Sequence, residues 1–116
     1  MKGESTIKIM ERRMRKIIDQ LTGAGILKKD EKHIADVVYN LTIFQEYLIT
    51  DEDEKIETTK EITGYFNVIV GDVGNELFDT FVLEFRDGRA LGVNATRQDF
   101  RSKKFNISVN DASKFQ

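Results

Sequence analysis

The chain contains no cysteine, no proline and only one histidine among its 116 residues. Without cysteine, disulfide bonds, thiolate catalysis and cysteine-ligated zinc are all excluded. The lack of cysteine also suits a reducing compartment. Without proline, no X-Pro bond slows folding and no rigid proline-rich linker divides the chain. These absences narrow the chemistry that the chain can perform and leave no visible domain boundary.

Long apolar runs are also absent, so the sequence shows neither a transmembrane segment nor a secretory signal. Hydrophobic residues make up 40% of the chain and charged residues 33%, which is typical of a globular protein. The net charge of −2 gives no general attraction to nucleic acid or to an anionic membrane. We therefore expect one domain over residues 1–116, in the cytoplasm, with no cofactor, no metal and no membrane partner.

Charge is spread unevenly along the chain. Residues 1–33 carry a net charge of +4, residues 34–63 carry −6, and residues 64–116 are neutral. A basic segment followed by an acidic segment favours electrostatic steering of a partner, or self-association. The basic side chains early in the chain and the acidic run after them are therefore the first candidate contact surfaces.

Apolar residues recur at three- and four-residue steps in the first half of the chain, which predicts two amphipathic helices. The first is expected over residues 5–22 and the second over residues 30–49, with Asp30 as its N-cap. Their short connection predicts a helical hairpin over residues 5–49. The second helix has an unusually wide apolar surface, which suits burial on two sides or a homodimer formed through the helices.

The second half of the chain predicts antiparallel strands. Residues 80–94 are typical of a β-hairpin closed by a two-residue type I′ turn at Asp87-Gly88, a register that places Phe85 opposite Ala90. Strands are also expected at residues 65–70 and 105–109. Residues 51–63 suit either a short helix or a strand, and the threonines there favour the strand.

Together these elements predict an α+β domain. The helical hairpin is expected to pack on a four- to five-stranded antiparallel meander over residues 55–109, followed by a loose tail at residues 110–116.

Catalytic and ligand-binding patterns are poorly represented. The only histidine, His33, has no serine or cysteine partner in a recognisable nucleophilic pattern, so we expect a surface histidine and no enzyme activity. The glycine-containing segment 23–28 lacks the last glycine of a dinucleotide-binding loop and follows a predicted helix. The acidic run 51–54 fails the calcium-loop pattern, because Lys55 and Ile56 stand where an oxygen ligand and glycine are required.

Protein binding is the function that remains best supported. We expect a non-enzymatic binding module, similar in size and class to small inhibitors, immunity proteins and antagonists from phages or mobile elements, which act by covering a partner's surface. The predicted contact residues are Arg12, Arg13, Lys16, Asp51, Glu52, Asp53 and Glu54.

The alternative is a nucleic-acid-binding regulator. It would use the basic helix 8–16 and the basic segment 97–104, where phenylalanines stand among arginines and lysines as in surfaces that combine phosphate contacts with base stacking. The residues for this alternative are Arg12, Arg15, Arg97, Arg101, Lys103 and Lys104.

Overall fold

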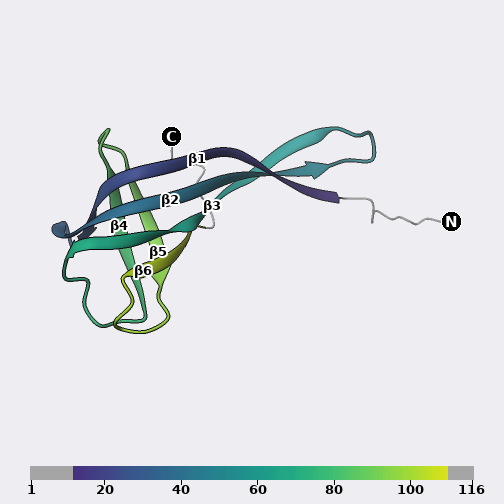
Figure 1. Cartoon of the computed structure of the whole chain (residues 1–116). Helices are drawn as coiled ribbons and strands as arrows, with labels where there is room; N and C mark the ends of the chain where they lie inside the picture. The colour runs from purple at the N-terminus through teal and green to yellow at the C-terminus, as the bar shows by residue number, and fades with distance from the viewer. Residues whose placement is uncertain (1–11, 110–116) are drawn as a thin grey trace.

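The computed structural model describes residues 12–109, and within them it contains six strands and no helix. The strands are β1 (Arg12–Lys29), β2 (Lys32–Ile49), β3 (Lys55–Gly71), β4 (Phe78–Phe85), β5 (Ala90–Thr96) and β6 (Lys104–Val109). They pair antiparallel in the order β1-β2-β3-β6-β5-β4, and the pairing of β4 with β1 closes a barrel (Figure 1). The expected α+β class is therefore wrong, because the described chain is all-β.

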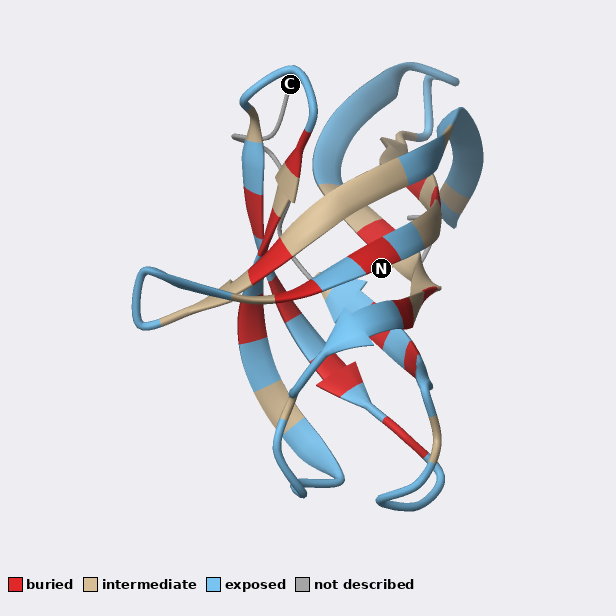
Figure 2. Ribbon diagram, turned by 60° about the vertical axis from the view of Figure 1, so that its left-hand side comes forward, coloured by how far each residue is buried: buried red, intermediate tan, exposed pale blue. Residues whose placement is uncertain are grey.

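The barrel interior holds the hydrophobic core. Alternate residues of each strand point inward, as Phe81, Leu83 and Phe85 do in β4. Phe66 and Phe105 are fully buried and stack with their ring centroids 4.9 Å apart. Figure 2 shows the alternation as short buried bands along the barrel strands. Each such aromatic side chain contributes about 1.5–3 kcal/mol through removal of its surface from water.

The helical hairpin predicted over residues 5–49 is replaced, from residue 12 onward, by the long β-hairpin of β1 and β2. β2 is apolar on both sides: Leu41 and Ile43 face the core, while Phe44 and Leu48 lie on the opposite face. Such a strand supplies apolar residues at almost every spacing, including the helical one. Its many β-branched and aromatic residues decide in favour of the strand. The proposed homodimer through helices has no structural basis, since the described residues form no helix.

Asp30 and Glu31 form the two-residue turn of this hairpin. Both have positive φ, 52° and 66°, as a type I′ turn requires, and Lys29 pairs with Lys32 across it. The N-cap role predicted for Asp30 is therefore wrong.

The hairpin predicted over residues 80–94 is present as β4 and β5, but its register differs by one residue. Glu84 pairs with Ala90 and Leu83 with Leu91, while the Gly88 N–H donates to the Phe85 carbonyl at 3.0 Å. Gly88 has φ 93°, so the connection is a three-residue loop with glycine in the left-handed position. The shift places Leu91, Val93 and Ala95 in the core, where the predicted register had placed their smaller neighbours.

The other strand predictions in the second half are confirmed. Residues 56–63 and 65–70 form one continuous strand, β3, and residues 105–109 lie in β6. The predicted tail at residues 110–116 lies outside the described residues.

β1, β2 and β3 are much longer than the barrel is tall. β6 pairs with β3 only from Ile62 to Asn67, and β4 pairs with β1 only from Gly25 to Lys28. Beyond these pairings the three long strands continue as a three-stranded extension of the same sheet, which projects from the barrel in Figure 1. We call this projection the arm. It comprises residues 12–20 of β1, 42–49 of β2, 55–61 of β3 and the connecting loop 50–54.

Candidate functional site

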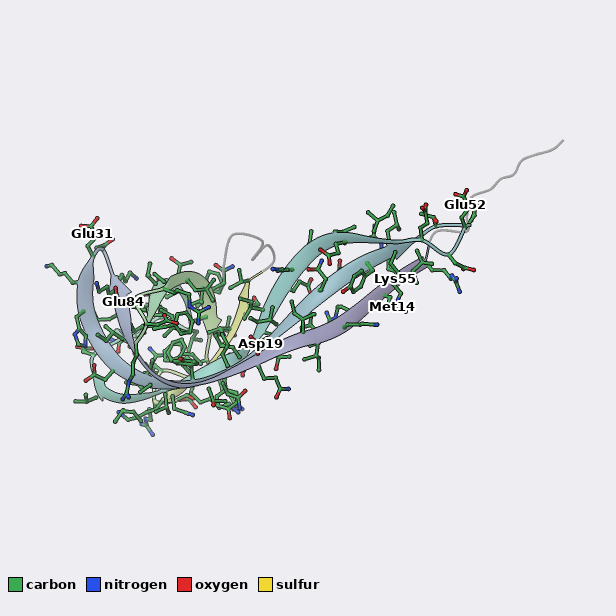
Figure 3. All side chains as sticks on the ribbon, turned by 90° about the horizontal axis from the view of Figure 1, so that it is seen from above. Met14, Asp19, Glu31, Glu52, Lys55 and Glu84 are labelled. Atoms are coloured by element: carbon green, nitrogen blue, oxygen red, sulfur yellow. The ribbon has the colours of Figure 1, made fainter. Side chains whose placement is uncertain are left out.

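The arm carries all the residues that the sequence predicted for protein binding. Arg12, Arg13 and Lys16 lie on β1, and the acidic run 51–54 forms the loop at the arm's far end. Figure 3 shows Glu52 at this tip and Glu31 at the opposite end of the molecule. One Arg12 guanidinium nitrogen lies 3.5 Å from a carboxylate oxygen of Asp53, so the two surfaces meet at the tip. The pair is well exposed, and such pairs contribute little to stability.

The basic residues do not share one face, as they would on a helix. Successive side chains of a strand point to opposite faces, so Arg12 and Lys16 lie on one side of β1 and Arg13 on the other. We call the side with Arg12 and Lys16 the inner face, because it continues the barrel interior. The side with Arg13 is the outer face.

Most charged side chains on the inner face of the arm are basic. Lys16 pairs with Gln45, which in turn pairs with Lys60, so two lysines flank a glutamine that is only 4% exposed. The Lys16 side chain also reaches Lys55 from the far edge strand, and this contact lowers the pKa of the Lys55 ammonium. Two cations held this close together favour an anionic group between them. The sequence-based analysis had not singled out Lys55 or Lys60, because their position beside Lys16 depends on the strand register.

The outer face combines apolar and charged groups. The Arg15 guanidinium lies 4.1 Å from the centre of the Phe44 ring and donates to Glu61 at 2.9 Å. Beside this group, Ile17 and Ile56 are 57% and 48% exposed. In Figure 2 much of the arm is coloured as exposed, in contrast to the banded barrel. An exposed mixture of aliphatic side chains and arginine is common in protein–protein contact surfaces.

Backbone and side-chain hydrogen bonds order the acidic tip. The Thr50 hydroxyl accepts the backbone N–H groups of Glu52 and Glu54, at 3.3 and 3.2 Å. The Thr50 N–H donates to the Glu54 carbonyl at 3.0 Å, which closes the loop. The four carboxylate side chains are exposed. Within residues 12–109, no group of three or more acidic, histidine or cysteine side chains is arranged to hold a metal ion.

The basic segment 97–104 lies on the barrel, on the connection between β5 and β6. Arg97 is 8% exposed, and its guanidinium donates to the carbonyls of Gly74, Glu76 and Ser102. These bonds occupy Arg97 in holding two loops together. Arg101 and Lys103 are exposed, and the Arg101 guanidinium lies 5.7 Å from the ring centre of Phe100, itself 60% exposed.

The nucleic-acid residues are not brought together by the fold. Arg12 stands in the same row of the sheet as Lys55, whereas Lys104 pairs with Asn67. These β3 positions are about 40 Å apart along the strand, at about 3.3 Å per residue. The arm arginines and the barrel cations therefore form two separate basic surfaces.

His33 lies at the start of β2 and pairs with Asp36 at 2.8 Å. Both side chains are about half exposed. The surface position predicted for His33 agrees with this placement.

The outer barrel wall holds an apolar groove of about 460 Å³ that sequence reasoning did not find. The residues that line it include Val38, Ile69, Glu84 and Arg86. In the helix predicted over residues 30–49, Val38 would have belonged to the apolar surface, whereas in the strand it is 40% exposed. The groove gives a second apolar surface against which the arm can be compared experimentally.

Among residues 12–109 there is no helix with the length and hydropathy needed to cross a membrane. Comparison with protein-family models, with curated proteins and with solved structures gave no match.

Proposed function

We propose that this protein is a non-enzymatic protein-binding module and that the arm makes the contact. It would act as small inhibitors and immunity proteins do, by covering a surface of its partner. The observation that carries the proposal is that both charged surfaces lie together on one projecting sheet, the Arg12–Asp53 pair marking their junction. Exposed aliphatic groups such as Ile17 and Ile56 stand among these charges.

The energetic argument is that the arm presents groups which gain by being covered. Burying an exposed isoleucine stabilises a complex by about 1.5–3 kcal/mol at most, and arginine is enriched where interfaces concentrate their binding energy. The charges around these groups would speed association and set orientation.

A comparison of the wild-type protein with two double variants tests this proposal. Immobilised wild-type protein is compared with Arg13→Glu/Lys16→Glu on the arm and with Arg101→Glu/Lys103→Glu on the barrel, an equal change of charge. We expect one dominant protein to be captured from native lysate by the wild type and the barrel variant but not by the arm variant, with or without nuclease. Equal capture by all three forms would contradict the arm as the contact surface.

Nucleic-acid binding is the second candidate, favoured by the exposed Phe100 with Arg101 against its ring. Arg101 and Lys103 would contact phosphates while Phe100 stacks on a base. In this case retention on single-stranded nucleic acid should fall steeply with salt and be lost in Arg101→Glu. Binding that is insensitive to salt and to this substitution would exclude it.

A further inference from the structure

The first half of β1 is an open sheet edge among the described residues. β2 pairs with β1 along its whole length, but β4 reaches only Gly25–Lys28 on the other side. The N–H and C=O groups that point away from β2 between Arg12 and Gln20 therefore have no strand beside them in the described part of the chain. From Arg12 to Ile17 the register with β2 is unbroken, and a bulge follows before Asp19. This stretch is a regular template for one additional strand of about six residues.

The side chains along this edge are cationic on both faces of the sheet. Arg12 and Lys16 flank Met14 on the inner face, and Arg13 and Arg15 precede Ile17 on the outer face. Any strand added here would have cations beside it above and below the sheet. Opposite charges on neighbouring strands stabilise a sheet, whereas like charges destabilise it.

We propose that β1 binds an extended acidic segment of the partner protein as an added β-strand along Arg12–Ile17. Main-chain hydrogen bonds to the open edge would supply affinity, and carboxylates opposite the four cations would supply specificity. This inference rests on the proposed function, since it names how the arm would engage its protein partner.

The same charges argue against pairing of two copies through this edge. In an antiparallel pair of β1 edges, every cation would face a cationic strand, which is unfavourable. Lysine and arginine on exposed edges are a common protection against such self-association. An acidic strand is the occupant that this edge attracts while it repels its own copy.

A designed octapeptide is the first probe: acetylated and amidated Thr-Val-Glu-Glu-Val-Glu-Glu-Thr. Paired antiparallel, it places glutamate opposite Arg12, Arg13, Arg15 and Lys16 and valine opposite Met14 and Ile17. Two further versions are N-methylated at alternate residues, in the two opposite phases. All three peptides carry the same charge, but only one N-methylated phase removes the N–H groups that point toward β1.

Titration of the 116-residue protein should then distinguish strand pairing from charge attraction. We expect one N-methylated peptide to bind at least about tenfold more weakly than the other, because two or three backbone hydrogen bonds are lost. Amide hydrogen exchange should slow at alternate residues of Arg12–Ile17 when the unmodified peptide is bound. Equal affinity for the two N-methylated peptides, or no binding of the unmodified one, would overturn the proposal.

Two double variants test whether the peptide binds to the arm. Arg13→Glu/Lys16→Glu should weaken the unmodified peptide at least about tenfold, since two of the four opposite charges are reversed. Arg101→Glu/Lys103→Glu should leave its affinity within about twofold, because charges beyond a Debye length are screened. Equal losses in both variants would show attraction by net charge and would overturn strand addition.

Strand addition and arm-mediated binding can fail separately. If the arm variant loses capture of the natural partner while the two N-methylated peptides bind alike, the arm binds a folded surface and strand addition is wrong. If the two peptides differ as expected but capture does not depend on the arm, the proposed function is wrong.

Discussion

The structural role of some residues in this protein cannot be predicted from their amino-acid type. Arg97 is the clearest case, since it belongs to a basic segment yet lies buried with its guanidinium against the Phe105 ring at 4.8 Å. Two of its three carbonyl partners lie in the connection between β3 and β4, and the third lies in the connection between β5 and β6. A buried arginine is stable only when its donors are satisfied, and here the loop carbonyls satisfy them.

Removing this side chain should destabilise the barrel. Arg97→Ala leaves three carbonyls without their donor and a space beside Phe105, so we expect a loss of about 2–4 kcal/mol in the free energy of unfolding. Urea denaturation measures this loss, with Arg101→Ala as the exposed control, which should change stability by less than about 0.5 kcal/mol. Equal stability of the two variants would mean that Arg97 does not hold the loops.

Asp79 gives a pH-dependent contribution to stability. Lys29 donates to its carboxylate and the Thr80 N–H donates at 2.8 Å, and the Lys29 contact, ahead of the others, lowers the pKa of Asp79. A carboxyl whose folded pKa is lowered stabilises the fold above its unfolded pKa, about 3.9, and loses this effect as the pH falls through the folded value.

Asp79→Asn should therefore cost about 1 kcal/mol at neutral pH, a modest value because Lys29 is 41% exposed. The difference from wild type should begin to shrink near about pH 4 and disappear at lower pH. Urea midpoints measured across this range provide the test. A difference that stays constant down to pH 2 would contradict the ionic origin.

The proposed contact residues could be chosen from the charge pattern of the sequence alone, but their grouping in space could not be predicted. A helix would have placed Arg12, Arg13 and Lys16 close together, whereas the strand separates Arg13 from the other two. Lys55 and Lys60 were missed for the same reason, since only the register brings them beside Lys16.

At the scale of elements, β1, β2 and β3 each pass through two environments. In the barrel one side faces a closed core, whereas in the arm most side chains of both faces are at least partly exposed. The change occurs near Gly64 of β3, which pairs with Leu41 on one side and Ile107 on the other. Gly64 has φ 152°, and a Cβ added there would lie 2.1 Å from the carbonyl oxygen of Asn40.

Gly64→Ala should therefore be severely destabilising. The clash is with backbone, so the strands must separate locally, and we expect a loss of at least about 2 kcal/mol. Gly92→Ala in β5 is the matched control, because a Cβ there meets nothing within 4 Å. Alanine in a strand interior should be neutral or stabilising by about 0.5 kcal/mol. Thermal unfolding of both variants tests this prediction. Equal midpoints would contradict the close packing of Gly64 against the Asn40 carbonyl.

The short elements were predictable and the long ones were not. β6 and the β4–β5 hairpin have clear alternation of apolar and polar residues, bounded by turn residues, and both were predicted. The loop of the hairpin has three residues instead of the predicted two. In β1 and β2 apolar residues lie on both faces of the sheet. Their spacing in the sequence therefore also fits the period of a helix. The Asp30-Glu31 turn also carries no glycine, which removes the usual hairpin signal.

At the scale of the whole molecule, the arm makes the shape elongated. The extents are 63 × 30 × 21 Å and the radius of gyration is 18.3 Å. A compact domain of this length has a radius of gyration of about 13 Å. Small-angle X-ray scattering of the monomer should give a value near 18 Å, with a distance distribution skewed to long distances. A value close to 13 Å would show that the arm is folded back on the barrel.

The central claim is that the arm is the surface that meets another protein, and site-specific photo-crosslinking tests it most directly. A photoreactive amino acid replaces Ile56 on the arm, Val38 in the barrel groove or Thr80 on the barrel wall, each an exposed position. We predict that irradiation in native lysate joins one dominant protein to the Ile56 form and not to the other two. Crosslinking of the same protein from Val38 or Thr80 but not from Ile56 would contradict the account.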